Sequence, residues 1–134
     1  MSIRKYITVS EMDNFQEYII MPKAFIDISY YREMDVDSKF IYILLLNKAR
    51  LSYKNKWFDD EGRIYFIYKN DDLRLMANIP SKQRLIKAKK ELIEKKLLEQ
   101  TRIGNGRPNQ LYLMYPLTAK ELEENISLKQ QIEV

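Results

Sequence analysis

Four polar side chains at the start of one segment could recognise another molecule through charge and hydrogen bonds. They are Lys82, Gln83, Arg84 and Lys87, and they follow Ser81 directly. Arginine and lysine suit the acceptors on the guanine edge, and glutamine suits the adenine edge. In helix-turn-helix proteins, side chains at the start of the second helix reach those base edges in the major groove. The residue types therefore predict that this segment contacts duplex DNA.

Residues 82–96 have the pattern of an amphipathic helix, with the apolar residues on one side at about 100° per residue. Ser81 is a good N-cap, and its hydroxyl and the first amides of the helix would suit a phosphate. Lys82 lies near the apolar edge by helical phase, so base contact and phosphate contact both stay open for it. The apolar side is predicted to hold Leu85, Ile86, Ala88, Leu92 and Ile93, and the outer side Gln83, Arg84, Lys87, Lys90, Glu91 and Glu94.

A short helix is predicted just before the basic one, from residue 70 to the apolar position at 79. The Asn-Asp-Asp run at 70–72 offers capping oxygens and first-turn negative charge. The helix should stop at Asn78 and the Ile79-Pro80 pair, since proline lacks an amide hydrogen and moves its predecessor out of helical geometry. Two helices joined by so short a turn form a helix-turn-helix.

Two strands are predicted after the basic helix, over residues 97–102 and 110–115. The intervening loop contains the Gly-Asn-Gly run at 104–106, which can supply the positive φ values of a tight turn. A thin hairpin in this position is a β-wing, and its polar side chains suit the DNA backbone or the minor groove. The candidate wing contacts are Arg102, Asn105, Arg107 and Asn109. A solvated hairpin beside a solvated helix is the alternative.

Positive charge is concentrated in the same region. Residues 78–110 contain nine cationic and three acidic side chains, a net charge of +6. The whole chain has a formal charge of +4, so the remaining residues sum to −2. A basic segment on a slightly acidic body is an electrostatic footprint for phosphate.

The composition argues against an enzyme. The chain has no histidine and no cysteine, which excludes the triads that need either residue and the usual histidine-held metal of tyrosine nickases. The Gly104–Gly106 loop lacks the Lys-Ser/Thr of a Walker phosphate loop. The acidic run at 59–61 is a turn in this interpretation, because three adjacent carboxylates in a hairpin do not converge on a metal. We expect no catalytic activity, no cofactor and no metal site, and we assign most of the ten tyrosines to the core and strands.

The other segments predict one globular domain of 134 residues without disulfides. Its longest apolar run, residues 40–46, is far shorter than the roughly 20 residues that span a bilayer. A buried helix, apolar on nearly every side, should follow the capping residues at 35–38 and continue to about residue 51, under both the helix pair and the sheet. These features favour a soluble, cytoplasmic protein. The fold class predicted is α+β, a winged helix-turn-helix with a small antiparallel sheet.

Three regions are expected along the chain. Residues 1–21 form an arm with candidate strands at 6–9 and 18–21, and the arm could contact its own domain or a neighbouring subunit. Residues 22–116 form the winged-helix domain, with a helical turn at 24–26, a hairpin turn at 59–62 and a strand at 64–68. Residues 117–134 hold a helix from Thr118 to about residue 125, followed by the start of a linker to a C-terminal domain that this chain lacks. Weaker phosphate candidates stand on the loop after the central helix, namely Lys54, Asn55 and Lys56.

Several segments resemble one family, the N-terminal domain of RepA_N-type plasmid replication initiators, and within it the initiators of large staphylococcal multiresistance plasmids. The similarity spans residues 21–115, and the most specific block is Trp-Phe-Asp-Asp-Glu-Gly-Arg-Ile-Tyr at 57–65. The matching segments are residues 37–52, 55–68, 81–92, 97–98 and 109–113, with Arg102 and Gly104.

The resemblance implies a winged-helix domain that binds directly repeated sites, or iterons, in a plasmid origin. It also implies a homodimer that pairs origin DNA and regulates copy number. Host replication proteins such as the primase would be engaged only by the C-terminal domain. Two alternatives stay open on the residues alone. One is a winged-helix transcriptional regulator that binds an inverted repeat, and the other is a winged helix used for protein assembly only.

Overall fold

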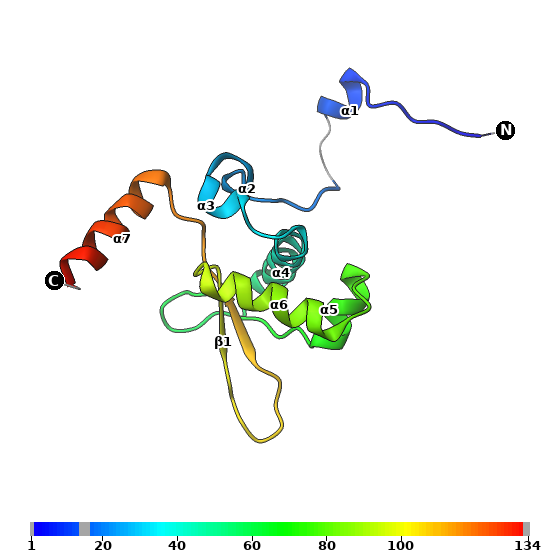
Figure 1. Ribbon diagram of the computed structural model, residues 1–134. Coiled ribbons are helices and arrows are strands. Elements are labelled where there is room, and N and C mark those ends of the chain that lie inside the picture. The colour runs from blue at the N-terminus through cyan, green and yellow to red at the C-terminus, as the bar shows by residue number, and fades with distance from the viewer. Residues whose placement is uncertain (1, 14–16, 133–134) are drawn as a thin grey trace.

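The computed structural model describes residues 2–13 and 17–132, and in these residues a group of helices carries one small hairpin (Figure 1). The body consists of α4 and the α5–α6 pair, with β1 and β2 extending from one side (Figure 1). The elements are α1 (Val9–Asp13), α2 (Ala24–Asp27), α3 (Ser29–Arg32), α4 (Val36–Lys54), α5 (Asn70–Ala77), α6 (Lys82–Glu94), β1 (Leu98–Thr101), β2 (Gln110–Leu113) and α7 (Ala119–Ile132). This is a winged helix-turn-helix of the α+β class, as the sequence predicts.

Helix α4 is the centre of the core and packs against α5, α6 and β2. Ile41, Leu45 and Ala49 on its inner side are buried with the apolar residues of α6 and the hairpin. The helix continues to Lys54, three residues beyond the predicted end. The prediction that this helix is buried because it is apolar on nearly every side is only partly correct, since Phe40 and Leu51 are 40% and 49% exposed.

Polar side chains fix α6 to the start of α4. Glu91 Oε1 accepts hydrogen bonds from the Asp35 amide at 2.9 Å and from Ser38 Oγ at 2.6 Å. Arg84 donates through Nε and Nη2 to the two carboxylate oxygens of Asp37, at 3.1 and 3.0 Å. We call these five residues the α4–α6 polar contact. A two-pronged arginine–carboxylate pair restricts orientation as well as distance, so the contact sets how α6 lies on α4.

The turn between α5 and α6 forms as predicted. Asn78 adopts the left-handed conformation that ends α5, with φ of 55°. Ser81 caps α6, since its Oγ accepts from the Arg84 amide at 3.3 Å. The prediction of side-chain capping at the start of α5 is wrong: the N-cap position is Lys69, which makes no side-chain cap.

The wing is a two-stranded antiparallel hairpin in which Leu98 pairs with Leu113 and Thr101 with Gln110. The strand predicted at 64–68 is reduced to isolated bridges, Phe58 with Ile64 and Phe66 with Leu111. Phe66 is fully buried and exchanges both backbone hydrogen bonds with Leu111, at 3.0 and 2.8 Å. The chain then leaves the sheet edge to begin α5 at residue 70, so pairing does not continue.

The two strands predicted in the N-terminal arm do not form. Of the first, only Val9 lies in a helix, α1, and residues 18–21 have no regular structure. A strand requires a partner for its backbone hydrogen bonds, and the described residues place none beside the arm. The apolar side chains described in the arm are exposed, including Ile3, Tyr6, Ile7 and Val9.

At the other end, α7 is longer than predicted and continues to Ile132 rather than residue 125. A capping box starts it: the Thr118 amide donates to Glu121 Oε1 at 3.0 Å, and the Glu121 amide donates to Thr118 Oγ1 at 3.2 Å. Helical structure therefore occupies residues 126–132, where the sequence predicts a linker, while residues 133–134 of that linker lie outside the described residues.

We expect folding stability to fall between pH 10 and pH 12 because of Tyr42. Its hydroxyl donates to the Met114 carbonyl at 3.0 Å, and burial raises its pKa to about 12. The unfolded chain loses this proton near pH 10, so the stability is fully present below pH 10 and is lost as the pH rises through 12. The loss amounts to about 2–3 kcal/mol. Urea unfolding of the wild type and Tyr42→Phe from pH 8 to 12 measures it, and parallel curves for the two proteins would contradict the assignment.

A double-mutant cycle tests the ion pair of the α4–α6 polar contact. Arg84 and Asp37 are 53% and 33% exposed, so solvent weakens their attraction. Urea unfolding of Asp37→Asn, Arg84→Gln and the double variant should give a coupling of about 0.2–1 kcal/mol that shrinks in high salt. The matched control is Lys87 and Asp35, whose charged atoms lie 3.9 Å apart with both side chains largely exposed. A control coupling as large as that of Arg84 and Asp37 would refute the special role of this pair.

Candidate nucleic-acid interface

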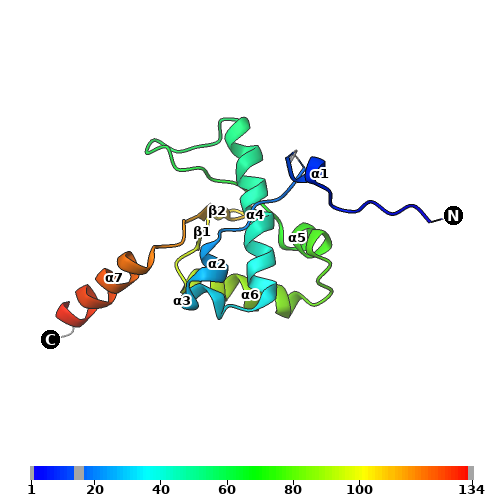
Figure 2. The same ribbon diagram turned by 90° about the horizontal axis from the view of Figure 1, so that it is seen from above.

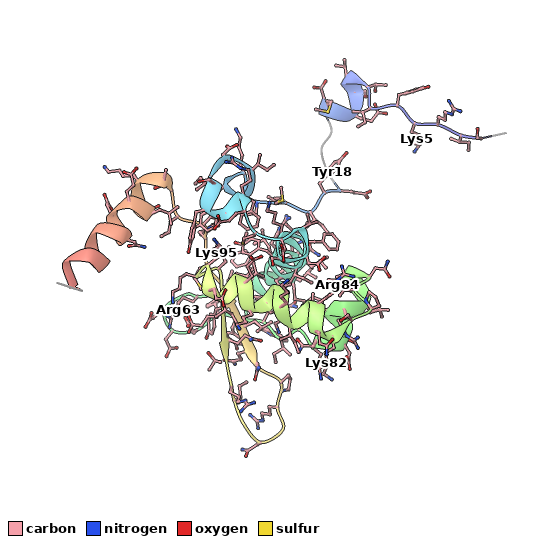
Figure 3. All side chains as sticks on the ribbon, in the orientation of Figure 1. Lys5, Tyr18, Arg63, Lys82, Arg84 and Lys95 are labelled. Carbon is pink, nitrogen blue, oxygen red and sulfur yellow. The ribbon has the colours of Figure 1, made fainter. Side chains whose placement is uncertain are left out.

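One face of α6 is open to solvent on the side where the wing projects. Lys82, Gln83 and Lys90 from the predicted set are exposed there. Figure 3 shows Lys82 pointing to the wing side of α6, away from α4. Lys82, Ile86 and Lys90 are spaced four residues apart, so they form a row along the helix. The face therefore carries positive charge, an amide and one apolar group together.

Ile86 is a member of this face that the sequence interpretation missed. It was assigned to the apolar side, but its side chain is 48% exposed. Helical phase places it about 100° from Leu85, which is fully buried, and this rotation takes it out of the core. Ile93, also assigned to the apolar side, is 37% exposed. The true buried stripe of α6 consists of Leu85, Ala88, Lys89 and Leu92.

Arg84 and Lys87 are exposed like Gln83, but each also lies beside an acidic residue at the start of α4. The Arg84 guanidinium contacts Asp37 on α4, and the hydrogen bond to that carboxylate raises the pKa of Arg84. The Lys87 ammonium lies 3.9 Å from an Asp35 oxygen. The predicted exposure of Arg84 and Lys87 is therefore confirmed, the pairing of Arg84 with Asp37 was not predicted, and a role in DNA contact stays a prediction for both cations.

The wing carries its four predicted side chains on an exposed loop. Gly104, Asn105 and Gly106 have φ values of 82°, 54° and 71°, so the expected tight turn is present. Arg102, Asn105, Arg107 and Asn109 are all exposed. The hairpin projects from the body on the same side as Lys82 (Figures 1 and 3). Helix α6 and the wing thus form one continuous surface.

The weaker phosphate candidates are not brought to this surface. Lys54, Asn55 and Lys56 lie at the C-terminal end of α4, whereas α6 is attached at its N-terminal end. A helix of 19 residues separates the two ends by about 27 Å. Figure 2, which views the molecule from above, shows this end of α4 extending away from α6. A ligand that contacts both these three residues and the exposed face of α6 would have to span that distance.

Two further cations, Lys95 and Lys89, are held by contacts within the protein that the charge pattern of the sequence does not predict. Lys95 donates to the Tyr30 carbonyl at 2.8 Å and to Glu33, and its ammonium lies 3.8 Å from the Tyr30 ring centroid. Lys89 is only 6% exposed and donates to Asn70 Oδ1 at 2.8 Å, and burial lowers its pKa. Helical phase could have identified Lys89, because Leu85 and Leu92, four residues before it and three after it, are both core residues.

The acidic run at 59–61 forms the predicted turn. Asp59 Oδ1 accepts from the Glu61 amide at 3.0 Å and from the Arg63 amide at 2.9 Å, and Gly62 has φ of 77°. The Arg63 backbone hydrogen bond is the main cause of the lowered pKa of Asp59. Across residues 2–13 and 17–132, no group of histidine, cysteine or acidic side chains is positioned to hold a metal ion. In the same ranges no helix has the length and apolar character needed to cross a membrane.

Three solved structures resemble this one over nearly its whole length. One is described as the N-terminal domain of a DNA-binding protein; it is 36% identical, covers 98% of both chains and has a TM-score of 0.71. A second is described as a Rep–DNA complex, with 35% identity, a TM-score of 0.71, and coverage of 97% of this chain and 98% of that chain. A third, an MDR initiator, is 34% identical with a TM-score of 0.67, and covers 93% of this chain and 98% of the other.

A curated relative from Lactobacillus helveticus, a "41 kDa protein", is 28% identical over 86 residues. The match covers 60% of this chain and 24% of the relative, so the chain aligns with about a quarter of that protein. The family described as the N-terminus of replication initiator protein A (RepA) matches residues 17–128. With a match over most of its length, the chain belongs to this RepA_N family of replication initiator N-terminal domains.

Proposed function

We propose that this chain binds double-stranded DNA sequence-specifically, as the DNA-binding domain of a plasmid replication initiator. The observation that carries the proposal is the exposed face of α6, formed by Lys82, Gln83, Ile86 and Lys90 beside a projecting wing. Support also comes from the family match and from a similar chain whose structure is a Rep–DNA complex. A recognition helix flanked by a wing is a common arrangement for reading the major groove while holding the adjacent backbone.

Each group on the α6 face has a distinct role in the proposed complex. Gln83 can pair with the adenine edge through two hydrogen bonds, and Ile86 can pack against a thymine methyl. Lys82 and Lys90 supply charge to guanine acceptors or phosphates. Ser81 and Lys87 contact the adjacent backbone, and Arg84 reaches DNA only after leaving Asp37. On the wing, Arg102, Asn105, Arg107 and Asn109 hold the flanking backbone or the minor groove.

The finer biological setting is proposed from the family. We propose that the DNA sites are direct repeats in a plasmid origin, that the domain acts as a homodimer able to pair origin DNA, and that this pairing regulates replication. The arm of residues 1–21 is a candidate dimer contact, with exposed apolar side chains such as Ile3 and Ile7. Host primase would be engaged by a further domain. We propose no catalytic activity for this domain.

Binding is tested by fluorescence anisotropy with three duplexes: the origin direct repeat, the same half-sites inverted, and a scrambled sequence. We expect the direct repeat to bind most tightly. Gln83→Ala should weaken binding to it by about 1–3 kcal/mol while leaving the scrambled duplex unchanged. Lys82→Ala tests the open question of base or phosphate contact. A phosphate contact would weaken all duplexes equally and reduce the salt slope by about 0.9.

Lys120→Ala is the matched control, because Lys120 is an exposed lysine on α7, outside the α6 face. It should bind like the wild type. Preference for the inverted arrangement would favour a transcriptional regulator instead. Equal binding to all three duplexes would indicate a domain that contacts only the phosphate backbone and does not recognise the base sequence. Absence of binding at low salt would overturn the proposal in favour of a protein-assembly module.

A further inference from the structure

Lys89 is a buried cation whose position the α6 face does not explain. It is only 6% exposed and lies among core residues of α6. An ammonium has three donors, and the one hydrogen bond found for Lys89 goes to a neutral amide oxygen, Asn70 Oδ1. Within the part of the chain that the structure describes, no carboxylate forms an ion pair with it. Burying a charge without an opposite charge is costly, so an apolar residue here would stabilise the free domain better.

A cavity of about 270 Å³ adjoins this lysine. It lies between the start of α5, the inner side of α6 and the wing, and we call it the α6–wing cavity. Besides Tyr68, its polar lining consists of Lys69, Asn70, Lys89, Gln100, Arg107 and Asn109. Three of these six side chains are cations and none is acidic. Segments distant in the sequence thus bring positive charge together around one hollow.

The start of α5 contributes to the same cavity. Lys69 is its N-cap, and no side chain caps the first amides of the helix. Such amides and the helix dipole favour an anion at this end. Two acidic residues follow, Asp71 and Asp72, and Asp71 is paired with Arg74 at 2.9 Å. Glu99 on β1 lines a different cavity, on the other side of the hairpin from Gln100.

The cavity lies toward the wing side of α6, the side to which the proposed DNA-binding face is directed. Lys89 comes seven residues after Lys82, so the two side chains project from nearly the same side of the helix. Lys82 is exposed near the start of α6, whereas Lys89 is buried two turns later, beside the wing. Arg107, already a candidate wing contact, is part of the cavity wall. A DNA strand crossing from α6 to the wing would pass its mouth.

We propose that the α6–wing cavity binds one phosphate group of the DNA backbone, with Lys89 as the buried anchor and Lys69 and Arg107 at the rim. This inference rests on the proposed function and adds to it a specific phosphate site outside the α6 face. A phosphate offers several acceptor oxygens to the unused donors of Lys89, and its charge balances the cation. Because phosphates carry no sequence information, the site sets the register of the domain on DNA and adds affinity to every sequence equally.

The test compares Lys89→Met, which keeps length and restores an apolar core, with the wild type on cognate and scrambled duplexes across a salt series. We expect weaker binding to both duplexes by the same factor, about three- to tenfold, and a salt slope reduced by about 0.9. Lys89→Gln should behave alike, and Lys120→Met is the matched control. Urea unfolding establishes that each variant is folded. Unchanged binding by folded Lys89→Met, or a loss confined to the cognate duplex, would overturn the site.

Replacing single phosphates of the duplex by neutral methylphosphonates locates the contact. One position should weaken the wild type and have no effect on Lys89→Met. The second experiment is a titration with inorganic phosphate. Binding is monitored by NMR through the backbone amide resonances of Lys69 and Asn70. Shifts lost in Lys89→Met, with no sensitive methylphosphonate position, would assign the cavity to a free phosphate and overturn the DNA backbone as its ligand. If the wild type binds no duplex, the proposed function fails, and the phosphate titration alone then decides whether the cavity is an anion site.

Discussion

The polar contact between α4 and α6 is the constraint on which the presentation of the recognition helix depends. The start of α4 has no side-chain cap of its own. Glu91, from α6, supplies the missing acceptor to the Asp35 amide and to Ser38, while Asp37 holds Arg84. These interactions are directional, so they specify the rotation of α6 more closely than apolar packing alone would. That rotation determines which residues of α6 face solvent.

The positive charge of the chain is therefore divided between two uses. Arg84 lies beside Asp37 of α4 and Lys95 beside Glu33 of the α3–α4 connection, where they attach α6 to the body, and Lys87 lies more loosely beside Asp35. Lys82, Lys90 and the wing arginines remain exposed on one side. A net charge counted along the sequence treats both groups alike. The charge available to an approaching polyanion is smaller than +6, but it is gathered on one surface, which is what directs association.

The order of helix, turn, helix and wing could be predicted from the sequence because each boundary has a local chemical cause. Ser81 caps α6, Asn78 ends α5, and the Gly104–Gly106 turn closes the hairpin. The errors have a different origin. Whether Arg84 pairs with Asp37, whether Lys89 is buried and whether Ile86 is exposed all depend on where α4 and the wing lie, which no local pattern contains. A strand in the arm likewise depends on a partner from elsewhere, and α7 continues because nothing in residues 126–132 breaks a helix.

The exposed isoleucine in the row of lysines gives the α6 face a mixed thermodynamic character. Attraction by Lys82 and Lys90 weakens as salt rises, because it derives largely from released counterions. The affinity gained by removing the Ile86 side chain from water does not weaken as salt rises. That burial also lowers the heat capacity of the complex relative to the separate partners. Any ligand that covers the face fully should therefore keep a salt-resistant part of its affinity, marked by a negative heat-capacity change. A ligand held by charge alone, at a distance from the helix, should lack that signature.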